Sequence, residues 1–245
     1  MKHSFKYNDS DNIVKIGENV IINGEIIGNG NKIEIGGTRR ETVINLFING
    51  NNNNIKIGPH ALFNNLHINI GSKRWVSSET NVTIGNNFSI GGKGKFILPN
   101  SGNVLVIGDK CMFSNAVTIR GGEYPHLIFD LSNNDYCDES EGIFIGDHSW
   151  IGEGVYINKS VTIPRECIVG ARSVVTKRFT AENAVIAGNP ARVVKEGVQW
   201  VANIKALPEF PALKESFERS RMHVINMSDG NPIISSKSPE AGKGD

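Results

Sequence analysis

The chain has 245 residues, of which 26 are basic and 25 acidic, and its formal net charge is +1. This balance gives no support for nonspecific binding to nucleic acid, which requires a clustered basic surface. No run approaches the roughly 18 consecutive apolar residues of a transmembrane segment, and the N-terminus lacks the apolar core of a secretion signal. We therefore expect a cytoplasmic protein. Cys111, Cys137 and Cys167 form neither a CxxC pair nor a metal-ligand spacing, so no bound metal is expected.

Residues 1–100 contain aliphatic–glycine pairs at irregular spacings. The pairs are Ile16-Gly17, Ile35-Gly36, Ile57-Gly58, Ile70-Gly71, Ile84-Gly85 and Ile90-Gly91. The irregular spacing indicates a repeat that is interrupted by insertions. Asparagine tolerates left-handed backbone angles, so the asparagine-rich run 49–54 favours turns between repeats.

Two polar excursions, residues 36–41 and 72–78, interrupt this region. They contain the cations Arg39, Arg40, Lys73 and Arg74. An anion site is one interpretation of these cations, and solvated loops are the interpretation we favour. Trp75 is more distinctive, because an exposed indole often packs on a sugar face or a partner surface.

From Ile107 the phase tightens, and between Ile145 and Val175 one six-residue period runs unbroken. The large positions are Ile145, Ile151, Ile157, Ile163, Val169 and Val175, and the small positions are Ser149, Val155, Val161, Cys167 and Ser173. Such a period fits neither a helix nor an alternating strand. It is typical of a β-helix, in which each hexapeptide forms one flat side of a coil and stacked coils bury the aliphatic columns.

Glycines and one aromatic residue punctuate this repeat. Gly146, Gly152 and Gly170 follow large aliphatics, where we expect turns that need positive φ or a close backbone approach. Phe179 is next in the small series. It is too large for that position, so it marks the end of the pattern.

The segment 120–144 breaks the phase, because the distance from Ile119 to Ile145 is not a multiple of six. Its composition is rich in Asp, Asn, Ser, Glu and Gly. We therefore expect an extended loop that leaves the coil. Long loops on a rigid scaffold are where function concentrates.

After Val175 the repeat closes, and the Gly-Asn-Pro run 188–190 turns the chain out of the prism. Helical spacing is expected from Pro211 to Met222. We predict a β-helix domain over 1–196 with the loop 120–144 inserted, and a C-terminal extension over 197–227 with a short helix. The polar tail 228–245 is expected to be disordered.

The stretch from Cys111 to Trp200 resembles the left-handed β-helix (hexapeptide-repeat) acetyltransferases. The matching segments are GDHSWIG (146–152), GARSVVTK (170–177) and AGNPARVV (187–194). Residues 111–114 and 120–130 are similar to the subgroup that O-acetylates capsular or lipopolysaccharide sugars, which includes sialic-acid and polysialic-acid O-acetyltransferases. In that subgroup a proline follows the loop histidine, whereas here Pro125 precedes His126.

The resemblance implies acetyl-CoA as the donor and a homotrimer with a site in the groove between neighbouring prisms. His126 matches the catalytic histidine and would act as general base on an acceptor hydroxyl, which histidine chemistry near neutral pH allows. Trp150 matches the active-site tryptophan that lines the acceptor and donor groove. The positions that would hold coenzyme A are Ala171 through its backbone, Thr176, Lys177, Arg192 and Lys195, where cations suit the phosphates. Candidates for acceptor binding are Arg120, Glu123, Tyr124 and Trp75.

The leading hypothesis is therefore O-acetylation of a sugar hydroxyl on a bacterial surface polysaccharide, a capsule or lipopolysaccharide. N-acetylation of a nucleotide-linked amino sugar would use the same scaffold and base. A zinc protein of the γ-carbonic anhydrase type needs three converging histidines, and only His126 and His148 lie in the right part of the chain. A noncatalytic scaffold is the remaining alternative.

Overall fold

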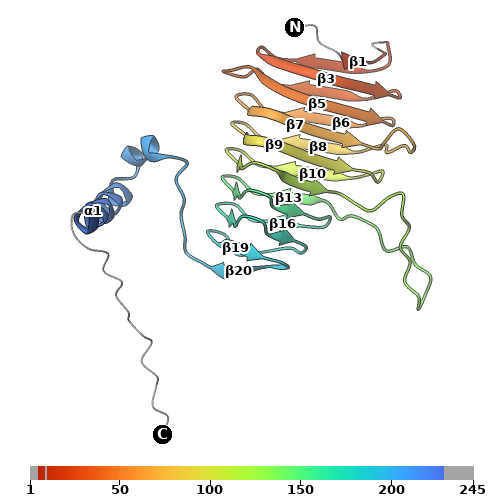
Figure 1. The fold of residues 1–245 in the computed structure, drawn as a ribbon. Helices are drawn as coiled ribbons and strands as arrows, with labels where there is room; N and C mark the ends of the chain where they lie inside the picture. The colour runs from red at the N-terminus through yellow and green to blue at the C-terminus, as the bar shows by residue number, and fades with distance from the viewer. Residues whose placement is uncertain (1–4, 9, 229–245) are drawn as a thin grey trace. The chain divides into compact units, whose positions relative to one another are not determined.

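The computed structural model describes residues 5–8 and 10–228. The chain divides after Trp200 into two compact units, and Figure 1 labels many of their elements. The strands of the first unit are β1 (Phe5–Lys6), β2 (Ile13–Ile16), β3 (Val20–Ile27), β4 (Lys32–Ile35), β5 (Thr42–Asn49), β6 (Asn54–Ile57), β7 (Leu62–Ile70), β8 (Asn81–Ile84), β9 (Ser89–Leu98), β10 (Val104–Ile107), β11 (Met112–Phe113), β12 (Val117–Arg120), β13 (Ile143–Ile145), β14 (Trp150–Ile151), β15 (Tyr156–Ile157), β16 (Thr162–Ile163), β17 (Ile168–Val169), β18 (Val174–Val175), β19 (Val185–Gly188) and β20 (Ala191–Lys195).

The first unit is a left-handed parallel β-helix, as the sequence predicted. One face is a seven-stranded parallel sheet in the order β16-β13-β10-β8-β6-β4-β2. The long strand β9 pairs at Ser89 and Ile90 with β11, and further along with β12. One strand in the early coils therefore covers two faces that later coils build from separate strands. The result is a stack of three-sided coils, seen edge-on in Figure 1.

One column of isoleucines runs the length of the seven-stranded sheet. In register order it contains Ile16, Ile35, Ile57, Ile84, Ile107, Ile145 and Ile163. Insertions at the corners change the sequence spacing without disturbing this register. Four of the six aliphatic–glycine pairs of the first hundred residues thus belong to one column, and those at Ile70 and Ile90 lie on strands of the other sheet. Burying the column supplies apolar area that holds the coils together.

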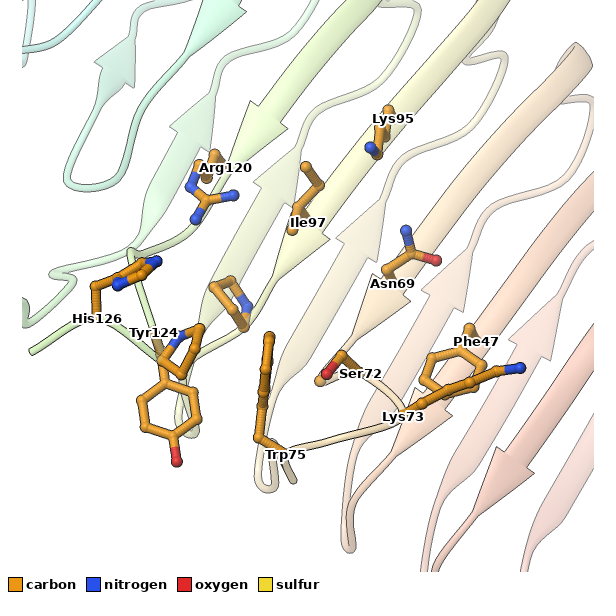
Figure 2. A pocket seen from close by; sticks show the side chains of 13 residues that line it. Phe47, Asn69, Ser72, Lys73, Trp75, Lys95, Ile97, Arg120, Tyr124 and His126 are labelled. Atoms are coloured by element: carbon orange, nitrogen blue, oxygen red, sulfur yellow. The ribbon is translucent and has the colours of Figure 1, made fainter.

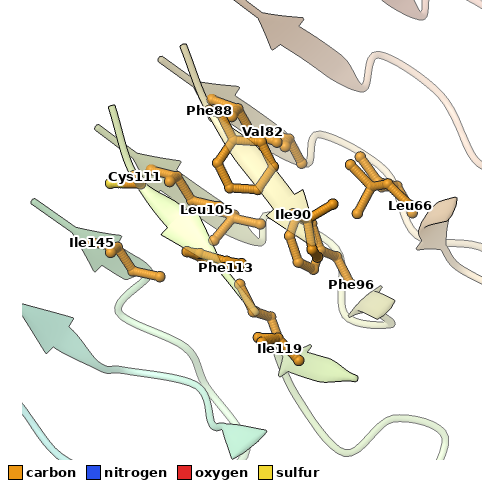
Figure 3. Packing of buried hydrophobic residues seen from close by; sticks show 14 of the residues in the cluster. Leu66, Val82, Phe88, Ile90, Phe96, Leu105, Cys111, Phe113, Ile119 and Ile145 are labelled. Atoms are coloured by element: carbon orange, nitrogen blue, oxygen red, sulfur yellow. The ribbon is translucent and has the colours of Figure 1, made fainter. Parts of the chain in front are cut away.

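The middle coils fill their interior with phenylalanine. The Phe88 and Phe113 rings meet edge to face with centroids 5.0 Å apart, and Phe96 meets Phe113 at 6.2 Å. Figure 3 shows these rings together with Ile90, Leu105 and Ile119. Aromatic pairs in this geometry add stabilisation beyond their buried area.

The glycines of the repeat are required by close packing and not by positive φ. A Cβ on Gly146 would lie 2.4 Å from the backbone nitrogen of Arg165, and one on Gly152 would lie 2.7 Å from that of Ala171. The left-handed backbone falls two residues after the glycine, at His148 (φ 50°) and Arg172 (φ 59°). Of the two explanations offered by the sequence, close approach is therefore the correct one here.

Phe179 ends the column of large residues, although its sequence position belongs to the small series. Thr162 bridges Arg178 in parallel, so Phe179 comes next to Ile163 on the large column and is buried. It ends the repeat as predicted, but it does so by capping the large column and not by overfilling the small one.

The loop leaves the prism after Arg120 and returns at Ile143, in agreement with the predicted phase break. Figure 1 shows it projecting from the stack beside β10 and β13. It is folded on itself, because Phe129 and Tyr136 form an antiparallel bridge and their rings lie 5.7 Å apart.

The prism ends with an antiparallel pair, β19 and β20. The second unit contains a 3₁₀ helix (Ile204–Glu209) and α1 (Pro211–Ser228), so the predicted helix exists and continues to Ser228. The rest of the predicted disordered tail, 229–245, lies outside the described residues. None of the described helices is both long and apolar enough to span a bilayer.

Candidate active site

A buried carboxylate anchors the projecting loop to the prism. Asp138 is fully buried and forms an ion pair with Lys159. It also accepts hydrogen bonds from the backbone N–H of Glu123 at 2.8 Å and from Asn100 Nδ2 at 2.9 Å. Burial alone would raise the pKa of Asp138. The hydrogen bonds from Lys159, Asn100 and the Glu123 backbone outweigh that effect, so the pKa lies below its ordinary value. The anchor fixes the stretch that carries His126.

His126 lies at the rim of a cavity between this loop and the outer face of the early coils. The cavity has a volume of about 650 Å³ and is lined by Phe47, Asn69, Gly71, Ser72, Lys73, Trp75, Lys95, Ile97, Pro99, Arg120, Tyr124, Pro125 and His126. Figure 2 shows Trp75, Tyr124 and His126 reaching in from the two loops, and Asn69 and Lys95 from the strands. We call this cavity the His126 pocket.

The His126 pocket combines aromatic rings with cations. Trp75 and Tyr124 meet edge to face with centroids 6.1 Å apart. Arg120 Nε lies 2.9 Å from Glu123 Oε2, which neutralises one cation and holds the first turn of the loop. Among the described residues, Lys73 and Lys95 have no acidic partner within ion-pair distance. The pocket therefore suits a sugar whose face packs on an indole and which also carries negative charge.

The structure thus brings together His126, Arg120, Tyr124 and Trp75, although Trp75 is far from the others in sequence. Glu123 does not line the pocket itself, but it forms an ion pair with Arg120, which does. The His126 backbone N–H donates to Glu123 O at 3.1 Å. Within the described residues, the His126 imidazole has no hydrogen-bond partner.

Trp150 does not line the His126 pocket. It points outward from β14, and its indole Nε1 donates to Ser114 Oγ at 3.2 Å. Trp200 packs beside it with ring centroids 5.9 Å apart and donates from Nε1 to His148 O at 2.8 Å. His148 stacks on Trp200, and its Nδ1 lies 2.7 Å from Glu166 Oε2.

The residues expected to hold coenzyme A gather at the C-terminal end of the prism. Ala171, Thr176, Lys177, Arg192 and Lys195 are all exposed there. Lys177 Nζ lies 5.3 Å from the Phe179 ring centroid, and Arg192 bonds to the carbonyl of Ala191. These cations lie on an exposed surface, and none of them lines the His126 pocket.

Two features escaped the sequence reasoning. Lys95 lines the pocket, and only the alternation of β9 could have marked it as outward. Asp138 was one of many acids in a polar loop, with no signal that it alone is buried. In the described part of the chain, no group of three His, Cys, Asp or Glu side chains is placed to hold a metal ion.

The chain is similar in sequence to known O-acetyltransferases. No family model matches it. The polysialic acid O-acetyltransferase of Neisseria meningitidis is 30% identical over 202 residues, which cover 81% of this chain and 89% of that protein. The galactoside O-acetyltransferase of Escherichia coli K12 is 33% identical over 139 residues, covering 56% of this chain and 67% of that one.

Two solved structures agree with these relatives. The polysialic-acid-specific acetyltransferase NeuO superimposes with a TM-score of 0.71 at 26% identity, over 84% of this chain and 86% of that chain. The polysialic acid O-acetyltransferase OatWY gives 0.62 at 28% identity, over 88% and 99%. The fold and these relatives together define an acetyl-transferring enzyme built on a β-helix. The chain belongs to the hexapeptide-repeat O-acetyltransferase family.

Proposed function

We propose that the enzyme transfers acetyl from acetyl-CoA to a hydroxyl of a bacterial surface polysaccharide, a capsule or lipopolysaccharide, with His126 as general base. The observation that carries the proposal is the position of His126 at the rim of a pocket that also presents Trp75 and Tyr124. An imidazole beside aromatic rings is the arrangement needed to activate a hydroxyl on a stacked sugar.

The proposed reaction needs no covalent enzyme intermediate. His126 removes the proton from the sugar hydroxyl as the oxygen attacks the thioester carbonyl. The tetrahedral intermediate collapses, the carbon–sulfur bond breaks, and the imidazolium returns its proton to the leaving thiolate. The products are a sugar acetate ester and coenzyme A.

The acceptor we propose is anionic. Lys73 and Lys95 face the pocket, and the described residues offer them no ion-pair partner. A carboxylate or phosphate on the polymer would form charge-assisted hydrogen bonds with them. The named activities of the two relatives on polysialic acid, a carboxylated polymer, support this choice.

The donor site we propose lies between neighbouring prisms of a homotrimer. Thr176 and the cations Lys177, Arg192 and Lys195 are exposed in one chain, and half-buried Trp150 does not line the His126 pocket. A second copy completes the site. Ala171, through its backbone, and Thr176 contact coenzyme A, and Lys177, Arg192 and Lys195 bind its phosphates. This arrangement would let His126 of one chain work beside Trp150 of the next.

The test is an acceptor screen with acetyl-CoA, measuring thiol release and the product mass. Wild type should acetylate polysialic acid to a base-labile ester, and His126→Ala should lower kcat by about 10²- to 10⁴-fold. Glu139→Ala, at an exposed position of the same loop, is the matched control. Turnover that persists in His126→Ala would overturn the assigned base, and a base-stable product would indicate an amide.

A further inference from the structure

A second cationic cavity lies at another corner of the prism. It has a volume of about 380 Å³ and is lined by Arg39, Arg40, His60, Ala61, Leu62, Asn87, Phe88 and Ser89. No acidic side chain lines it, and among the described residues neither arginine forms an ion pair. We call it the arginine cleft. Two guanidinium groups on a concave surface suit a carboxylate or a phosphate.

The arginine cleft and the His126 pocket lie at opposite ends of the same two strands. On β7, Leu62 lines the cleft and Asn69 lines the pocket. On β9, Ser89 lines the cleft and Lys95 lines the pocket. Because β7 has nine residues, at roughly 3.3 Å per residue the two sites are at most about 30 Å apart along it.

The strand surface between the two sites is free of acids. β5, β7 and β9 contain no Asp or Glu, whereas β4 on the seven-stranded sheet places Glu34 3.3 Å from Lys15. The outward side chains on β7 and β9 include His67, Lys93 and Lys95. Burial lowers the pKa of His67, and the charges of Lys93 and Lys95 lower it further, so the positive potential extends across this surface.

Amide side chains accompany these cations. Asn45 Nδ2 donates to Asn65 Oδ1 at 2.9 Å, on neighbouring strands, and Asn69 continues the row into the pocket. Amides can both donate to and accept from sugar hydroxyls. The strand surface between the two sites thus offers hydrogen-bonding groups for sugar hydroxyls and positive charge for the acid groups of the polymer.

We propose that the arginine cleft is a remote binding site for the acceptor, in which Arg39, Arg40 and His60 hold an acid group of the polymer several sugars away from the reacting hydroxyl. This inference rests on the proposed function and specifies its substrate as a linear polyanion and not a single sugar. Binding at the cleft raises the effective concentration of the polymer at the His126 pocket. A short acceptor reaches the pocket alone and gains nothing from the cleft.

The test compares Arg39→Gln/Arg40→Gln with Lys32→Gln/Lys56→Gln. Both variants remove two exposed positive charges, and the control pair lies on β4 and β6 of the seven-stranded sheet, outside the arginine cleft. For long polysialic acid, the arginine variant should raise KM about tenfold with kcat unchanged, and its KM should depend less on salt. For a sialic acid disaccharide, KM should not change. The control variant should resemble wild type with both acceptors.

Direct binding in the absence of donor separates this inference from the proposed function. Titration of wild type and the arginine variant with polysialic acid and with inorganic polyphosphate shows whether the cleft prefers carboxylate or phosphate, and weaker binding of either polymer to the variant supports the site. Equal polymer affinity in both proteins, or an equal loss in the lysine control, would overturn it. Loss of disaccharide turnover in the arginine variant would also overturn it, since the cleft would then act on the reaction itself. If neither wild type nor any variant turns over any acceptor, but the polymer still binds through the arginine cleft, only the proposed function is rejected.

Discussion

At the scale of single residues, glycines that look equivalent in the sequence have different structural roles. Gly146 and Gly91 each follow an isoleucine of the repeat. A Cβ on Gly146 would lie 2.4 Å from backbone, whereas the nearest atom to a Cβ on Gly91 is Phe113 O at 3.8 Å. Neither has a positive φ, so the difference is one of space alone.

Gly146→Ala should therefore lower the free energy of unfolding by about 3 kcal/mol, because the coils must separate locally to admit the methyl group. Gly91→Ala should change it by less than about 1 kcal/mol. Urea unfolding followed by circular dichroism measures both. Equal effects at the two positions would contradict the packing explanation.

The three thiols should react very unequally. Burial raises the pKa of Cys111 to about 12 and raises that of Cys167 as well, while Cys137 is exposed. Because the thiolate is the reactive form, we expect a thiol reagent near neutral pH to label Cys137 rapidly and the other two only after denaturation. Peptide mass spectrometry identifies the site, and rapid labelling of Cys111 in the native enzyme would contradict its burial.

At the scale of elements, the loop that carries His126 depends on one buried ion pair. Asp138 is joined to Lys159, to Asn100 and to the Glu123 backbone. Replacing the carboxylate leaves Lys159 without its partner and weakens the bonds that hold the loop. We therefore treat Asp138 as a positioning residue for His126.

Asp138→Asn should lower the free energy of loop opening by about 3 kcal/mol. Hydrogen exchange of peptides covering 121–142 measures this, with the exposed Asp135→Asn as the control on the same loop. Since the folded pKa of Asp138 lies below its ordinary 3.8, the carboxylate stabilises the loop fully above that pH and the stabilisation is lost as the pH falls below it. Loop protection that stays unchanged below about pH 3 would contradict this account.

The elements differ in how far the sequence could predict them. The hexapeptide period predicted the coils from Ile145 to Val175, because each large residue must reach the same buried column. It also predicted the loop, because a phase break has no place inside the stack. It could not show that Trp75 meets Tyr124, since that contact depends on how long each corner insertion is. Nor could it show that Asp138 is buried, because burial of one acid in a polar loop has no periodic signal.

At the scale of the whole molecule, the two predicted catalytic residues are separated. His126 lines a pocket with residues from the early coils, while Trp150 packs against Trp200 on another face. If both act in one reaction, a neighbouring chain must bring them together. A cyclic trimer does so through one repeated interface.

Mixed trimers test this arrangement. His126→Ala and Trp150→Ala should each lower activity about 100-fold or more. Any ring containing both kinds of subunit has one junction at which an intact histidine faces an intact tryptophan. Random mixing gives about three quarters mixed rings with one active site in three, so activity should return to about one quarter of wild type. Activity that stays at the level of the parent variants, in a preparation shown by sedimentation to contain mixed trimers, would place both residues in sites built from a single chain.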